Sequence, residues 1–150
     1  MTKEDVLNIQ REWANGIIKM GKLSNDRDEL EIFTKEFLKK NYDFENQVLF
    51  KPTKAKDIQF RNDLESAISY FIGGSNRKCE EDLGFALSKW IDIKFENSDI
   101  IINDHIAHAM GNYTFKSQKS EVKVEYSFSY KSYDTGLKII LHHSSIPYQL

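Results

Sequence analysis

The hydrophobic pattern of this chain changes its period once, and that change constrains the fold more than any other feature. Up to about residue 82, apolar residues recur every three or four positions, which is the period of an amphipathic helix. From about residue 90 they alternate with polar residues, as in a strand with one buried face. Helices followed by strands predict an α+β fold, with the helices packed on one face of a curved, mainly antiparallel sheet.

The first half predicts three helices and one short strand. Apolar residues at helical spacing mark residues 2–21 and about 24–41 as the first two helices. The run 47–50 is short and apolar enough for a strand, and the proline that follows ends it. A third helix is predicted over about 57–71, with Phe60 on its buried side.

The second half predicts a meander of four strands. They are expected over about 90–102, 106–116 and 121–131 and in the stretch that leads to the C-terminus, with a bulge in the first of them near Ser98. If the sheet curls around the helices, it encloses a conical pocket that the end of the last strand can line.

Composition bounds the function classes. The 150 residues show no break in composition and predict one domain over 1–150. A net charge of −2 argues against nucleic acid as a partner. The single cysteine, Cys79, cannot form an internal disulfide and is interpreted as a surface thiol. No apolar run reaches the roughly 18 residues of a membrane helix, and no signal-peptide core is present, so a cytoplasmic protein is expected.

The last strand turns from apolar to polar within two residues, in the stretch Ile139 to Tyr148. On a straight strand, Ile139, His143 and Ser145 share one face, while His142 and Ser144 share the other. Adjacent histidines then point apart and cannot both bind one ion. The residues leave two interpretations open, namely a polar end wall of the pocket or an exposed polar C-terminus.

Other familiar sites are not indicated. His105 and His108 have a metal-ligand spacing only on a helix, and they fall in a turn and a strand, so zinc is disfavoured. No zinc, phosphate-loop or dinucleotide motif occurs. Arg61 lies within reach of the acidic run 80–82, and a structural salt bridge is favoured over anion binding.

Six segments carry a family resemblance when taken together and in order. They are Phe50-Lys51-Pro52-Thr53-x-Ala55, Phe60-Arg61, Ala67-x-Ser69-Tyr70-Phe71-Ile72-Gly73-Gly74, Glu81-Asp82-x-Gly84-Phe85-Ala86, Ala109-Met110-Gly111-Asn112-Tyr113 and Leu141-His142-His143-Ser144-Ser145-x-Pro147-Tyr148. Over about residues 45–150 the chain resembles iota-class carbonic anhydrases. Those proteins are similar in fold to the association domain of calmodulin-dependent kinase and to other cone-shaped nuclear-transport-factor-like and SnoaL-like domains, which commonly form homodimers.

The resemblance implies an enzyme for the reversible hydration of carbon dioxide to bicarbonate, without metal or other cofactor. Carried over by position, it implies that Thr53, Tyr70, His143 and Ser145 hold carbon dioxide, water and bicarbonate. Residue chemistry also favours His143, because a neutral imidazole with a pKa near ~6.5 can accept a proton from water. The hypothesis is that His143 is the base and that the three hydroxyl groups position the substrate and donate hydrogen bonds to it.

Two other functions are compatible with such a cone. The same fold can serve as a non-catalytic association or small-ligand-binding module. A proton-shuttling isomerase would need a carboxylate inside the cone, and the sequence places none there. A pocket large enough for an organic ligand would favour either alternative.

Overall fold

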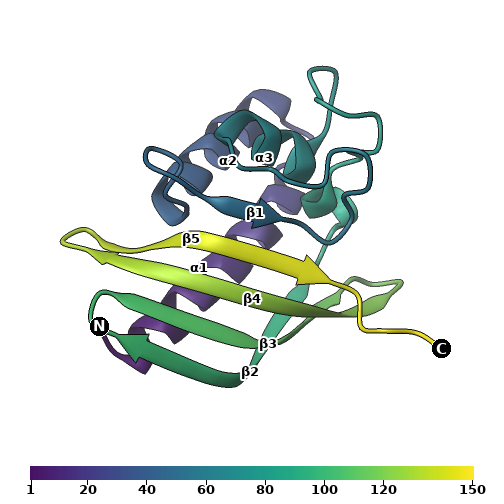
Figure 1. Cartoon of the computed structure of the whole chain (residues 1–150). Coiled ribbons are helices and arrows are strands. Elements are labelled where there is room, and N and C mark those ends of the chain that lie inside the picture. Colours follow the sequence, from purple (N-terminus) through teal and green to yellow (C-terminus); the bar gives the residue numbers. More distant parts are fainter.

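The computed structural model describes residues 1–150, in which three helices cover one face of a five-stranded sheet (Figure 1). The helices are α1 (Lys3–Lys22), α2 (Arg27–Asn41) and α3 (Leu64–Ile72), and a short 3₁₀ helix, η1, spans Phe85–Ser88. The strands are β1 (Leu49–Lys51), β2 (Asp92–Asn103), β3 (Ile106–Lys116), β4 (Glu121–Tyr133) and β5 (Gly136–Ser145). The predicted α+β fold is confirmed.

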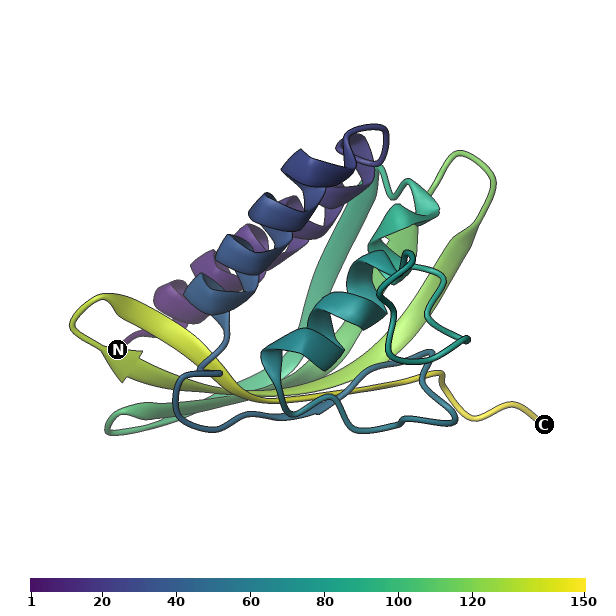
Figure 2. The same cartoon turned by 90° about the horizontal axis from the view of Figure 1, so that it is seen from above.

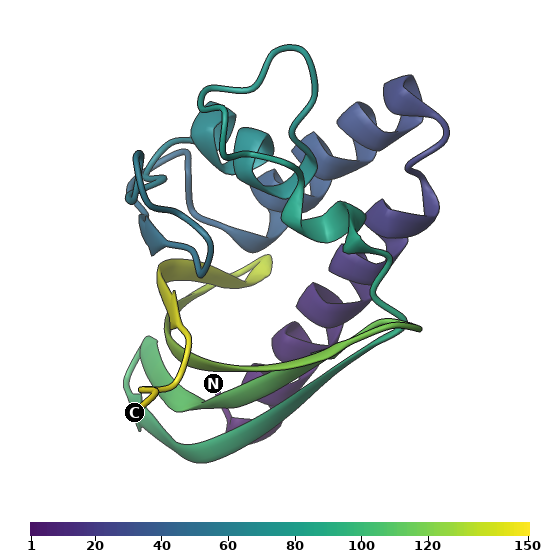
Figure 3. The ribbon, with the colours of Figure 1, turned by 90° about the vertical axis from the view of Figure 1, so that its right-hand side faces the viewer.

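The sheet has the strand order β1-β5-β4-β3-β2. Strands β2 to β5 form an antiparallel meander, and β1 pairs with β5 in parallel. The long strands bend around the helices, so that α1 lies along the concave side of the sheet (Figures 2 and 3). No helix has both the length and the hydropathy needed to cross a bilayer.

The first two predicted helices are confirmed, and a side chain caps the start of each. Thr2 and Asp5 form a capping box at the start of α1, and the Asp26 carboxylate caps α2 by accepting from the backbone of Glu29. Each apolar stripe faces the sheet or the other helices. Such caps stabilise a helix by about 1 kcal/mol each.

The predicted start of the third helix is wrong. Helix α3 begins at Leu64, because the Asp63 carboxylate caps it by accepting from the Ser66 backbone. The residues before it form a loop. Hydrogen bonds of the Arg61 side chain hold this loop, in place of the backbone hydrogen bonds of a helix. Phe60, predicted to be buried, is 65% exposed on this loop.

Two bulges shape the sheet. The expected bulge in β2 is confirmed between Asn97 and Asp99. Gly111 lies opposite Asn97, where a Cβ atom would come within 2.1 Å of the Glu96 carbonyl oxygen, so only glycine fits there. A second bulge was not predicted: Ser129 pairs with Leu141 but Tyr130 pairs with Ile139, which leaves Ile140 as an extra residue of β5.

The core between the layers is built largely from aromatic rings. Trp13 of α1 lies at its centre and contacts six other rings, those of Phe71, Phe95, Tyr113, Phe115, Phe128 and His142. Aromatic pairs of this kind contribute about 0.5–1.5 kcal/mol each beyond their buried area. The polar atoms of these rings find partners inside the core: the Trp13 indole N–H donates to the Tyr42 hydroxyl, and the Tyr113 hydroxyl contacts His142 and Ser144 at the end of β5.

Candidate active site

A small cavity lies inside the cone, between the end of β5, the segment after β1, and helices α1 and α3. It is lined by Trp13, Phe50, Pro52, Thr53, Tyr70, Phe71, Phe85, Tyr113, His142 and Ser144. The space open to the centre of a water-sized sphere is ≈ 10 Å³, which is about the room that one water molecule needs. The cavity therefore suits a molecule of a few atoms and has no room for a larger organic ligand.

Two of the four predicted site residues line this cavity, and two do not. Thr53 and Tyr70 are among its lining residues. His143 is exposed on the outer face of the sheet, opposite Ser127. Ser145 lies on that same face and donates a hydrogen bond to the Glu125 carboxylate at 2.8 Å. The prediction that His143 and Ser145 face the pocket is wrong.

The extra residue in β5 is the physical reason for this error. Ile139 is buried, with 1% of its surface exposed, and on a straight strand it would share its face with His143. The bulge at Ile140 shifts the alternation by one residue. The inward residues after it are His142 and Ser144, each 2% exposed.

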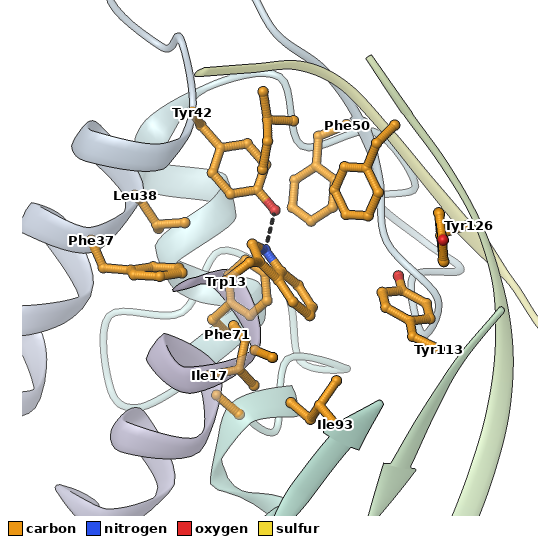
Figure 4. Close-up of a cluster of buried hydrophobic side chains, with 14 of the residues drawn as sticks. Trp13, Ile17, Phe37, Leu38, Tyr42, Phe50, Phe71, Ile93, Tyr113 and Tyr126 are labelled. Atoms are coloured by element: carbon orange, nitrogen blue, oxygen red, sulfur yellow. Dashed lines mark hydrogen bonds between the residues drawn. The ribbon is translucent and has the colours of Figure 1, made fainter. Parts of the chain in front are cut away.

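His142 is held on both ring nitrogens by hydroxyl groups. Its Nδ1 lies 2.8 Å from the Tyr42 hydroxyl. Its Nε2 lies 3.0 Å from the Tyr113 hydroxyl and 3.1 Å from the Ser144 hydroxyl, and these two hydroxyls also contact each other. Figure 4 shows Tyr42 and Tyr113 projecting into the same aromatic cluster from opposite sides. With every side of the ring occupied, His142 has a single well-defined position.

Two phenylalanine rings enclose the imidazole. The ring centroid of Phe128 lies 4.0 Å from that of His142, and the ring of Phe50 stacks at 4.8 Å. Burial among these rings lowers the pKa of His142 well below its usual value of 6.5, and the neighbouring His143 lowers it further. Burial likewise raises the pKa values of the Tyr42 and Tyr113 phenols. All three groups are therefore neutral near pH 7.

Tyr70 and Thr53 form the opposite wall. Helix α3 carries Tyr70, whose hydroxyl accepts a hydrogen bond from the Lys54 backbone at 3.3 Å. This contact ties the segment after β1, including Thr53, to the helix. The Tyr70 ring stacks on Phe85 at 5.6 Å, and burial raises the pKa of its phenol. At neutral pH, Tyr70 is therefore a hydrogen-bond donor and not a phenolate.

A buried ion pair supports that wall from behind. The Arg61 guanidinium donates two hydrogen bonds of 2.7 Å to the two oxygens of the Asp82 carboxylate, which confirms the predicted structural salt bridge. Ser69 donates a third hydrogen bond to Asp82, at 2.5 Å. The guanidinium also lies 5.8 Å from the centroid of the Tyr70 ring. The network connects the loop after β1 with the loop before η1.

The only cluster that could hold a metal ion lies away from the cavity. Asp57, Cys79 and Glu81 bring one ligand atom each within 4.8 Å of one another. The Glu81 carboxylate, however, already accepts hydrogen bonds from the backbone N–H groups of Lys56 and Asp57. The cavity itself offers one histidine, and its lining contains neither a cysteine nor a carboxylate. The carboxylate that an isomerase-type proton shuttle would require is therefore missing from this wall.

Several site residues escaped the sequence prediction, namely Trp13, Tyr42, Tyr113, His142 and Ser144. Trp13 is visible in the sequence only as one member of an apolar helical stripe. Tyr113 belongs to a segment that carries the family resemblance, so its position was marked but its role was not. Tyr42 comes directly after α2, and nothing local indicates that its hydroxyl meets a ring 100 residues further along the chain.

Comparisons with known proteins agree on one family. The family model for metal-independent carbonic anhydrase matches residues 4–146. The metal-independent carbonic anhydrase of Nostoc sp. (strain PCC 7120) is 30% identical over 155 residues, covering 99% of this chain and 75% of that protein. A crystal structure of the iota-carbonic anhydrase from a cyanobacterium, complexed with bicarbonate, has a TM-score of 0.93 at 28% identity, covering 100% of this chain and 94% of the other.

More distant structures show the fold alone. A calcium/calmodulin-dependent protein kinase II association domain from Xanthomonas campestris has a TM-score of 0.66 at 18% identity, covering 100% of this chain and 91% of that one. An NTF-2 like protein from Shewanella oneidensis has a TM-score of 0.57 at 17% identity, covering 97% and 99%. The predicted nuclear-transport-factor-like fold is confirmed. The family model matched over residues 4–146 and the 30% identical relative show that the chain belongs to the metal-independent carbonic anhydrases.

Proposed function

We propose that this chain hydrates carbon dioxide reversibly, without a metal ion, in the cavity formed by Thr53, Tyr70, Tyr113, His142 and Ser144. The observation that carries the proposal is the convergence of four hydroxyl groups and one imidazole on a space of ≈ 10 Å³ that has no charged side chain in its lining. Membership of the family and the likeness to a bicarbonate-bound relative support it.

Hydration joins a water oxygen to the carbon of carbon dioxide, releases a proton from that water and places negative charge on the substrate oxygens. A site without metal must stabilise this charge with hydrogen-bond donors, and one such donor can be worth about 10²–10³ in rate. Hydroxyl groups can act as these donors. They can also relay the released proton, because each can accept a proton on its oxygen while passing on its own. We assign the proton transfer to these hydroxyl groups and to water.

The role of His142 differs from that of the base expected from the sequence. A buried imidazole whose pKa lies well below 6.5 is a poor proton acceptor at neutral pH. Both of its nitrogens, moreover, are already occupied by hydroxyl partners. His142 therefore orders Ser144 and Tyr113 and does not itself take up the proton from water.

Stopped-flow hydration assays test the proposal with two neighbouring serines. Ser144→Ala should lower kcat/KM about 100-fold, because it removes a hydroxyl from the cavity. Ser145→Ala is the matched control, since it removes only an exposed contact with Glu125, and it should retain the wild-type rate. Hydration by the wild type should also persist in a metal chelator.

The outcomes separate the enzyme from a non-catalytic module of the same fold. Activity that disappears with chelator and returns with zinc would overturn the metal-free version. Equal activity of the two serine variants would show that the reaction does not take place in this cavity. If the wild-type chain has no hydration activity, the remaining function is that of a non-catalytic association module. Its interior here is packed with aromatic rings.

The homodimer expected from the resemblance is also a proposal. It is supported by apolar side chains on the outer face of the sheet, where Ile101 is 57% and Met110 is 62% exposed. A second copy of this chain would cover them. Sedimentation of the intact chain at several concentrations tests the proposal, and a monomer at every concentration would refute it.

A further inference from the structure

Trp13, which lines the cavity, and Tyr42, which does not, determine which way the hydrogen bonds of His142 run. The Trp13 indole Nε1–H donates to the Tyr42 hydroxyl oxygen at 2.9 Å (Figure 4). An indole nitrogen can only donate, so the direction of this bond is certain. Tyr42 is fully buried, and its hydroxyl has one other partner, the Nδ1 of His142. The Tyr42 oxygen is therefore an acceptor toward Trp13.

The Tyr42 proton then has a single destination. If Tyr42 donates to Nδ1, then the Trp13 N–H group, the Tyr42 hydroxyl proton and the Nδ1 lone pair each have a partner. If Nδ1 instead carried the proton and donated to Tyr42, the hydroxyl proton of Tyr42 would be buried without an acceptor, which is costly. Nδ1 therefore presents its lone pair, and the neutral ring carries its proton on Nε2.

This tautomer decides what the cavity offers to a substrate. The Nε2–H group, the Tyr113 hydroxyl and the Ser144 hydroxyl contact one another, so three protons serve this triangle. Nε2–H donates to one of the oxygens, and the contact between the hydroxyls uses a second proton. A protonated Nε2 cannot accept the third. One hydroxyl proton therefore remains for a molecule in the cavity.

The other tautomer would reverse this property. With the proton on Nδ1, Nε2 would accept one hydroxyl proton, and the contact between Tyr113 and Ser144 would use the other. The triangle would then show only lone pairs to the cavity. Such a wall repels the oxygens of bicarbonate, whereas the Nε2–H form binds one of them.

We propose that Tyr42, oriented by Trp13, is a positioning residue that holds His142 in its Nε2–H tautomer and so makes the cavity a hydrogen-bond donor to bicarbonate. The choice of bicarbonate rests on the proposed function, whereas the tautomer follows from the hydrogen bonds alone. The titratable groups around the ring are the phenols of Tyr42 and Tyr113 and, on the outer face, His143. No carboxylate faces His142 to hold a proton on Nδ1.

The first test is ¹⁵N NMR of the intact wild-type chain, labelled at histidine, near pH 7.5. The expected spectrum has one histidine with an unprotonated Nδ1 and a protonated Nε2, assigned to His142 by its loss in His142→Gln. A protonated Nδ1 on His142 would overturn the proposal. This measurement needs no activity, so a wild-type chain that fails to hydrate carbon dioxide would overturn the proposed function while the spectrum still decided the tautomer.

The second test removes the orienting hydroxyl. In Tyr42→Phe, neither tautomer has a partner at Nδ1, so its nitrogen shift should move toward the average of the two forms. The KM for bicarbonate in the dehydration direction should rise about tenfold, with a smaller change in kcat. Trp13→Phe should shift both readouts in the same direction by less.

Tyr130→Phe is the matched control for these variants. Tyr130 is also a buried tyrosine, with 1% of its surface exposed, and it stacks on Phe128 without a contact to His142. Its removal should leave the His142 nitrogen shifts and the bicarbonate KM as in the wild type. A Tyr42→Phe variant that behaves like this control would overturn the proposal, and if Tyr42→Phe does not fold, the wild-type spectrum still decides it.

Discussion

Two polar networks are buried in this molecule, and they differ in charge. One joins Arg61, Asp82 and Ser69 behind the loops and is ionic. The other joins the groups around His142 and is neutral throughout. The Tyr70 ring lies near both: the Arg61 guanidinium is 5.8 Å from its centroid, and the ring lines the cavity. The molecule thus places full charges next to the candidate active site but not in its lining.

The difference reflects what each network must do. An ion pair with several hydrogen bonds fixes two loops in one arrangement, and it need not change during a reaction. In the cavity a fixed positive charge would retain bicarbonate after it formed, and a fixed negative charge would repel it. Neutral hydroxyl groups bind the product less strongly, and they favour charge that develops only as the reaction proceeds.

Removing the charge from the ionic network should have the largest effect. Asp82→Asn removes the closer carboxylate from the Arg61 guanidinium, which is fully buried, and leaves it only Glu81 at 3.7 Å. The expected loss is about 3–5 kcal/mol in the free energy of unfolding, measured by urea titration. Glu12→Gln breaks the exposed pair between Lys40 and Glu12 and should cost less than about 1 kcal/mol. Equal losses in the two variants would contradict the distinction between buried and exposed pairs.

A smaller effect in free energy, but a larger one in activity, is expected from the neutral network. His142→Gln should lower kcat/KM for carbon dioxide about 100-fold, because Tyr113 and Ser144 lose the group that orders them. His143→Gln changes the neighbouring side chain on the outer face and should leave kcat/KM unchanged. Stopped-flow assays of the two purified variants decide the matter. A loss confined to His143→Gln would restore the assignment made from the sequence.

The smallest effect is a dependence of stability on pH. The native pKa of His142 is depressed by burial, whereas the unfolded chain titrates near 6.5. Above that pH both states are neutral at this site and nothing changes. Below it the unfolded chain binds a proton that the native state does not bind, so stability falls by up to about 1.4 kcal/mol per pH unit. Urea midpoints between pH 7.5 and 5.5 should show this slope, and His142→Gln should reduce it.

Much of the fold could be predicted because its signals are local. Helix α1 has its cap at Thr2 and its apolar stripe within twenty residues, and the small and aromatic residues of β3 alternate with more polar ones from Ile106 to Lys116. The start of α3 could not be located this way, because the prediction did not recognise Asp63 as the cap. Whether the helix begins near residue 57 or at Leu64 depends on the side chain of Arg61 and its partner Asp82, which is 21 residues away.

The site was half predicted, and the reason lies in β5. Thr53 and Tyr70 stand in segments without a competing neighbour of the same type, so the family resemblance points to each of them unambiguously. The histidines and serines of β5 are doubled, so the same pattern of histidine, any residue, serine can be placed in two ways. The alternation from Ile139 selects the wrong one. Only the pairing with β4 reveals the extra residue that selects the other.

The doubled residues give β5 a redundancy at its bulge, where Ile140 has no partner in β4. A chain that lost Ile140 would keep Ile139 opposite Tyr130 and Leu141 opposite Ser129, so simple alternation would still turn His142 and Ser144 inward. A strand that instead took Ile140 into its ladder would slip by one residue and turn His143 and Ser145 inward, so the interior would still receive an imidazole and an alcohol. The tandem pairs thus make the chemistry tolerant of a one-residue slip that would otherwise abolish it.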